Sequence, residues 1–131
     1  MIPTTIEKWH LLVKTKNTDL LDEILADDVN MHSPVVHTVQ KGKEITKMYL
    51  SAASKTLCNN TFKYVREVYD KDFALLEFET EIDGISVNGV DMISLNPDGK
   101  ISDFKVMVRP LKGINVVHQV MGEALSAMQR R

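Results

Sequence analysis

One carboxylate stands among apolar side chains between Ile85 and Leu95, and no other position indicates chemistry as strongly. Successive residues of a β-strand point to opposite faces, so alternation places Asp91 on the face of its apolar neighbours. These neighbours are Ile85, Val87, Ile93 and Leu95. An ionised carboxylate is costly to bury alone, so such a group is paired, hydrogen-bonded or protonated. We therefore predict a raised pKa for Asp91 and a carboxyl group that can donate a hydrogen bond to a ligand.

A purely structural role for Asp91 is the alternative, in which the indole N–H of Trp9 or a backbone turn binds the carboxylate. Trp9 itself is either a core anchor or a donor that faces a pocket. Ser33 either caps a strand end or contacts a ligand, and His37 in the following loop could reach a cavity mouth. The four histidines show no metal-ligand spacing and Cys58 is the only cysteine. We therefore predict no metal site, no intramolecular disulfide and no cofactor.

The composition is that of an ordinary globular protein. The chain has 131 residues, of which 44% are hydrophobic and 26% charged, so we predict one domain over residues 1–131. A formal net charge of −2 argues against a nucleic acid or an anionic membrane as partner. No apolar stretch reaches the length of a membrane span, and the N-terminus does not show the pattern of a signal peptide. We expect a cytoplasmic protein.

The first part of the chain has the apolar spacing of helices. A first helix starts at Thr4, which opens a capping-box pattern, and a second, short helix ends at Asp27. A short strand over residues 29–32 follows, and the next residues include a proline that ends or bends it. After Gly42, apolar residues recur at helical spacing again and predict a third helix.

From residue 61 onward the apolar period changes to two. Four strands are predicted, over residues 62–69, 73–82, 85–95 and 100–108, and their short turn-like connections make them successive antiparallel neighbours. Gly89 in mid-strand indicates a bulge or a close backbone approach. A closing helix follows the last strand. This order predicts an α+β fold, with helices packed on a strongly curved antiparallel sheet that encloses an apolar pocket.

The pattern resembles the cone-shaped superfamily of nuclear transport factor 2, ketosteroid isomerase and the SnoaL-like polyketide cyclases. The resemblance rests on three segments in this order: Leu-Ala-Asp-Asp-Val-Asn-Met-His-Ser-Pro-Val at 25–35, Gly-Lys-Glu-Ile at 42–45, and Asp-Met-Ile-Ser-Leu-Asn-Pro-Asp-Gly-Lys-Ile at 91–101. The superfamily includes isomerases, dehydratases, cyclases, epoxide hydrolases and binding proteins without catalytic activity. Membership therefore implies the fold and names no reaction.

The resemblance also implies where an isomerase of this kind would hold its catalytic groups. In ketosteroid isomerase a carboxylate directly before a proline takes the substrate proton, while a tyrosine and a protonated Asp hold the oxyanion. Here the position before the proline is Ser33, the position of the tyrosine is Trp9, and only the Asp is kept, as Asp91. Because the base is missing, we predict no ketosteroid isomerase activity.

Strand phase and resemblance together predict the lining of the pocket: Trp9, Met31, Ser33, Tyr49, Val87, Asp91, Phe104 and Val106. The first hypothesis is a SnoaL-like protein that binds a small hydrophobic molecule. The second is a cofactor-free isomerase, dehydratase or cyclase for a hydrophobic carbonyl compound, with Asp91 as donor or acid. The third is a protein-interaction module that uses its sheet face. Since the base is missing, we favour binding. Met107 and Arg109 on the convex face, where many superfamily members dimerise, predict a homodimer.

Overall fold

The computed structural model describes residues 2–129 and confirms the predicted α+β fold. The elements, in chain order, are α1 (Thr4–Thr15), α2 (Leu20–Ile24), β1 (Leu25–His32), β2 (Gln40–Lys41), α3 (Lys43–Thr56), β3 (Lys63–Tyr69), β4 (Phe73–Ile82), β5 (Ile85–Leu95), β6 (Ile101–Arg109) and α4 (Leu111–Gln129). Among the helices of residues 2–129 we find no candidate for a membrane span.

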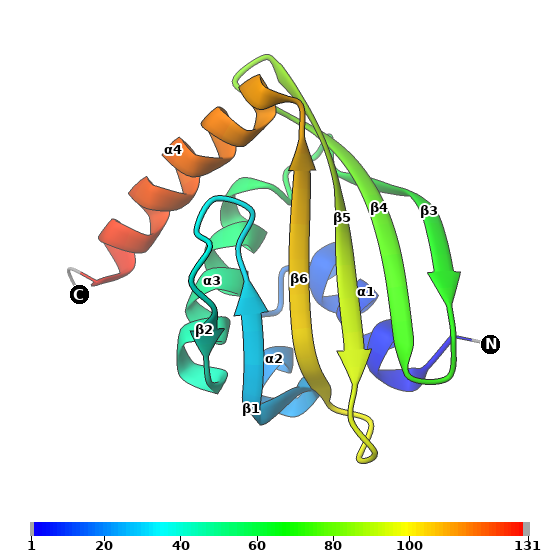
Figure 1. Cartoon of the computed structure of the whole chain (residues 1–131). Coiled ribbons are helices and arrows are strands. Elements are labelled where there is room, and N and C mark those ends of the chain that lie inside the picture. The colour runs from blue at the N-terminus through cyan, green and yellow to red at the C-terminus, as the bar shows by residue number, and fades with distance from the viewer. Residues whose placement is uncertain (1, 130–131) are drawn as a thin grey trace.

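The strands form one curved, unclosed sheet in the order β2-β1-β6-β5-β4-β3 (Figure 1). From β3 to β6 the strands are antiparallel neighbours, as their short connections predicted. The hairpin between β4 and β5 turns at Asp83 and Gly84, which both have positive φ, as a tight two-residue turn requires. One edge was not predicted: β1 pairs with β6 in parallel, and the two-residue β2 extends the sheet beyond it.

One helix cap and one boundary differ from the prediction. Pro3 precedes α1, and no side-chain hydrogen bond caps the helix, so the capping box expected at Thr4 does not form. The second helix ends earlier than expected, and β1 starts at Leu25 rather than at residue 29. Leu25 pairs with Ile101 of β6 and is buried, so the sheet extends the strand into a segment that looked helical.

Helices cover the concave face of the sheet, and the core lies between the two layers (Figure 1). In one cluster, Trp9 and Leu12 of α1 pack with side chains of α2, α3 and the sheet, among them Phe104. In a second cluster, Val116 and Val117 of α4 pack on the other end of the sheet. The two clusters meet around the centre of the sheet, which is where the predicted pocket should lie.

Gly89 makes the close approach that its position in mid-strand predicted, but not the alternative, a bulge. Pairing of β4 with β5 runs without a shift through Gly89, which lies opposite Phe78. A Cβ atom at Gly89 would lie 2.8 Å from Cε2 of Phe78 and 2.7 Å from the carbonyl oxygen of Met107. The missing side chain therefore makes room for the Phe78 ring on the concave face.

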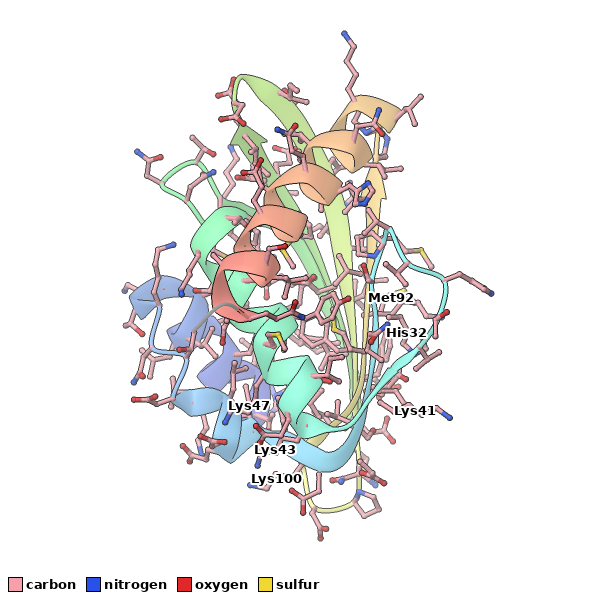
Figure 2. All side chains as sticks on the ribbon, turned by 90° about the vertical axis from the view of Figure 1, so that its left-hand side faces the viewer. His32, Lys41, Lys43, Lys47, Met92 and Lys100 are labelled. Atoms are coloured by element: carbon pink, nitrogen blue, oxygen red, sulfur yellow. The ribbon has the colours of Figure 1, made fainter. Side chains whose placement is uncertain are left out.

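Lysines fix α2 at one end of the molecule. Figure 2 shows Lys43, Lys47 and Lys100 gathered there. Lys47 forms an ion pair with Asp22 at 2.7 Å, Lys43 donates to the backbone carbonyl of Asp22 at 2.7 Å, and Lys100 donates to that of Glu23. The positive charges at this end are therefore engaged in holding α2 against its neighbours.

Candidate functional site

A cavity of about 60 Å³ lies between the helices and the concave face of the sheet. Seven of the eight residues predicted for its lining are found there: Trp9, Met31, Ser33, Tyr49, Asp91, Phe104 and Val106. Val117 and Met121 of α4 add to the wall, which is almost wholly apolar. Strand phase placed the sheet residues correctly on the concave face, because alternation holds along β5 and β6.

Val87 is the exception. It faces the helices and is buried, but it belongs to the cluster around Val116 and Val117 and does not line the cavity. The first turn of α4 lies over it, since a Cβ atom at Gly113 would lie 3.6 Å from the Val87 Cα atom. Strand phase gives the face of a residue, and the docking of α4 decides what covers that face.

Asp91 is 6% exposed, and a tyrosine that the sequence reasoning did not single out binds it. The hydroxyl of Tyr64 in β3 donates to Oδ2 of Asp91 at 2.6 Å, and the indole Nε1–H of Trp9 donates to the Tyr64 oxygen at 2.9 Å. The indole therefore reaches the carboxyl group only through the hydroxyl. Strand alternation gives Tyr64 the same face as Phe62, but its position opposite Phe78 is set by the pairing of β3 with β4.

Burial raises the pKa of Asp91 to about 7, and the hydrogen bond from Tyr64 opposes this by stabilising the carboxylate. Burial, followed by the charge of Asp91, raises the pKa of Tyr64 well above its ordinary value, so its hydroxyl stays neutral and acts as a donor. Near neutral pH, Asp91 is thus divided between carboxylate and acid. In the acid form it accepts from Tyr64 and has one O–H left to donate into the cavity.

Cys58 lines the cavity as well, but it is not a nucleophile here. Burial raises the pKa of its thiol to about 12, and the charge of Asp91 adds to this effect. The thiolate is the reactive form of cysteine, and at neutral pH it is almost absent at such a pKa. Cys58 therefore contributes surface to the cavity rather than chemistry.

Ser33 and the histidines take simpler roles. Oγ of Ser33 accepts a hydrogen bond from the backbone N–H of Val35 at 3.2 Å and so stabilises the turn at Pro34, while Ser33 also lines the cavity. His37 is exposed and is not part of the lining. Nε2 of His32 lies 2.8 Å from Oδ1 of Asp103, on the side of the sheet away from α1. Within residues 2–129, no three His, Cys, Asp or Glu side chains are placed to hold a metal ion.

The described lining of the cavity therefore contains one carboxyl group, Asp91, and no second acid or base of matching strength. Such a site can donate a hydrogen bond to a carbonyl or ether oxygen. Because the pKa of Asp91 lies near neutrality, the group can also exchange a proton with a bound molecule.

Solved structures share this architecture over nearly the whole chain. A steroid delta-isomerase from Pseudomonas aeruginosa is 29% identical, with a TM-score of 0.91 over 97% of this chain and 93% of that one. A protein with a cystatin-like fold from Silicibacter pomeroyi DSS-3 is 26% identical, with a TM-score of 0.83 over 97% and 86% of the two chains.

A nuclear transport factor 2-like protein of unknown function from Mesorhizobium loti shows the fold at 18% identity, with a TM-score of 0.71 over 81% of this chain and 88% of that one. A search of curated proteins gave no match. Residues 6–104, which make up most of the chain, match the family model of the SnoaL-like domain. The chain belongs to the SnoaL-like domain family.

Proposed function

We propose that this chain binds a small, mostly apolar molecule with a hydrogen-bond-accepting oxygen, and that Asp91 donates to that oxygen. The proposal rests on one observation: a buried carboxyl group with a pKa of about 7 stands in an apolar cavity, oriented by Tyr64. A carboxyl group kept neutral in an apolar site is a strong hydrogen-bond donor. The whole chain would act as one SnoaL-like domain, and the interaction needs no cofactor.

The size of the cavity limits the ligand. Pockets for drug-sized molecules have volumes of roughly 300–1,000 Å³, whereas this cavity has about 60 Å³. A molecule of a few carbon atoms fits with small side-chain adjustments, and a larger one requires side chains at the cavity wall to move. Ser33, Tyr49 and Met121 are among the half-buried parts of that wall, so they can move at a lower cost than the fully buried core.

Cyclohexanone is expected to bind about tenfold more tightly near pH 5 than methylenecyclohexane, which has the same shape and accepts no hydrogen bond. Fluorescence of Trp9, the only tryptophan and part of the cavity wall, measures both affinities. The preference should vanish in Asp91→Ala. It should persist in the control Asp98→Ala, since Asp98 lies in an exposed turn. Equal affinities in the unmodified protein would show that Asp91 does not donate to the ligand.

A cofactor-free isomerase or lyase is the second candidate. Two observations favour it: the 29% identity with the Pseudomonas aeruginosa steroid delta-isomerase, and the pKa of Asp91, which suits proton exchange at neutral pH. The absence of a second acid or base from the described cavity lining argues for binding alone. Only the second candidate predicts that the bound molecule is converted to a product, so a direct assay of turnover distinguishes the two.

We also propose a homodimer through the convex face of the sheet. Val68, Leu75 and Met92 form one cross-strand row there, and Val90 and Met107 form part of the next. Figure 2 shows Met92 on the side of the sheet away from α1. Val68 and Met107 are each at least half exposed, so pairing with a second copy would remove apolar side chains from water, with the charged Glu77 and Lys105 of the same rows beside them.

Sedimentation velocity at micromolar protein is expected to show a dimer. A glutamate in the centre of this face would place an unpaired charge in the interface, so Met107→Glu should give mainly monomer. Leu11→Glu is the matched control, because Leu11 is equally exposed but lies on α1. A monomer in the unmodified protein would contradict the proposal and would leave the convex face for a different partner.

A further inference from the structure

A second hollow lies directly behind one wall of the cavity. It is an open cleft of about 490 Å³ between α1, the loop that follows α3 and the start of β3. Four residues line both hollows: Val13, Cys58, Phe62 and Tyr64. All four are half-buried, whereas Leu12, Phe78 and Phe104 deeper in the cavity are fully buried. The cleft and the cavity are therefore separated by one layer of side chains that solvent already reaches.

The cleft is lined by positive and neutral side chains only. Lys14, Lys16, Lys63 and His10 contribute to it, and none of its described lining residues is an Asp or Glu. This is a marked local excess, since the whole chain has 18 acidic residues and 16 lysines and arginines. The nearest carboxylate that contacts the cleft is that of Glu67, which lies 2.6 Å from Nε2 of His10, and among the described residues it forms no ion pair with Lys14, Lys16 or Lys63.

Lys14 and Lys16 of the cleft differ from the lysines that hold α1 and α3 against α2. Lys8 and Lys47 form ion pairs with Glu23 and Asp22, whereas within residues 2–129 no carboxylate pairs with Lys14 or Lys16. The ammonium group of Lys16 is held in place nonetheless, because it donates to the backbone carbonyl oxygens of Ser54, at 3.1 Å, and Cys58. Its positive charge acts on the Cys58 thiol in the cavity wall, where it partly opposes the rise in pKa that burial causes.

From this juxtaposition we infer that the ligand of the cavity is an anionic amphiphile, a small molecule with an apolar body and a carboxylate at one end. The carboxylate lies in the cleft between Lys14 and Lys16, and the body passes the ring of Tyr64 into the cavity. The reverse orientation would place two carboxyl groups together at Asp91 in an apolar site, which the desolvation of charge disfavours. The inference rests on the proposed function, because it assumes that the cavity holds a ligand.

The test compares hexanoate and octanoate with their matched alcohols, 1-hexanol and 1-octanol, at low salt and near pH 6, where Asp91 is mostly protonated and the ligand carboxylates are mostly ionised. Trp9 fluorescence reports binding in the cavity. Each carboxylate is expected to bind about 5- to 10-fold more tightly than its alcohol, the size expected for one or two exposed ion pairs. The preference should shrink as salt is added, because exposed charges are screened.

Lys14→Glu should weaken octanoate binding about tenfold and leave 1-octanol binding unchanged, since Lys14 is exposed and makes no contact with the cavity. The matched control is Lys112→Glu, an exposed lysine on α4 that should change neither affinity. Equal binding of acid and alcohol, or a preference that survives in Lys14→Glu, would overturn the inference and leave the proposed function intact. No binding of any of the four molecules would overturn both.

Discussion

Asp91→Asn is expected to make the protein more stable at pH 8 and to remove most of the pH dependence of its stability between about pH 4 and 7. Replacing a buried polar residue that has a hydrogen-bond partner ordinarily destabilises a fold. The opposite result is expected here, because the folded state holds Asp91 in an environment that favours its neutral form, and asparagine is neutral at every pH.

The sign follows from the direction of the shift. The pKa of Asp91 is raised from 3.8 to about 7, with burial as the main cause. Below the unfolded pKa both states are protonated, and Asp91 imposes no ionisation cost. As the pH rises, the unfolded chain ionises first and binds fewer protons than the folded one, so the free energy of unfolding falls. The loss is complete above the folded pKa.

The size of the loss follows from the same values. A shift from 3.8 to about 7 corresponds to about 4 kcal/mol at about 1.4 kcal/mol per pKa unit. The asparagine variant does not lose this free energy, and its amide oxygen can still accept the hydrogen bond from Tyr64. We therefore expect a gain of about 2–4 kcal/mol at pH 8 and a change of less than about 1 kcal/mol near pH 4.

Denaturant unfolding of both proteins across this pH range measures the effect. Carboxyl-carbon NMR titration of Asp91 provides the pKa independently. The control is Asp98→Asn, since Asp98 is exposed in the turn before β6 and should change neither the stability at pH 8 nor its slope with pH. An Asp91 that titrates near its ordinary value, with a destabilised Asn variant at pH 8, would show that the residue is an ionised structural group.

The residues of the sheet show how far sequence reasoning reaches. The bounds of β4 and β5 agree with the prediction to the residue, because the Asp83–Gly84 turn and the turn after Leu95 fix their ends locally. Alternation within these strands then placed Asp91 on the concave face. The turn residues and the strand alternation both lie within a few residues of the features they predict. They can therefore be recognised in a single sequence.

The features that were missed depend on contacts between distant parts of the chain. The hydrogen bond from Tyr64 to Asp91 joins β3 to β5 across β4, and the parallel pairing of β1 with β6 follows a long connection. Val87 was placed in the cavity because nothing in β5 indicates that α4 will cover it. Such contacts are set by how the layers dock, and local spacing does not encode them.

Ketosteroid isomerisation by this chain is expected to be at least about 100-fold slower than that of the Pseudomonas aeruginosa steroid delta-isomerase, which is the matched positive control. General-base catalysis is typically worth about 10²–10⁴-fold, and Ser33 stands where the resemblance to ketosteroid isomerase places the base. Its Oγ accepts a hydrogen bond from Val35 N–H, and among residues 2–129 the cavity lining contains no imidazole or second carboxylate to activate it. Asp91 and Tyr64 can hold an oxyanion, but this does not remove the substrate proton.

The variant Ser33→Asp distinguishes two explanations for slow isomerisation: the missing base and a cavity too small for the steroid. The introduced carboxyl group would have an apolar wall beside it and Asp91 in the same cavity, and both should raise its pKa toward the range useful for proton abstraction. If the base alone is missing, the variant should turn over a Δ5-3-ketosteroid about 10- to 100-fold faster than the unmodified protein. If the cavity of about 60 Å³ excludes the steroid, both proteins should be equally inactive. Turnover by the unmodified protein within about tenfold of the positive control would contradict the expectation, and some other group would then have to act as the base.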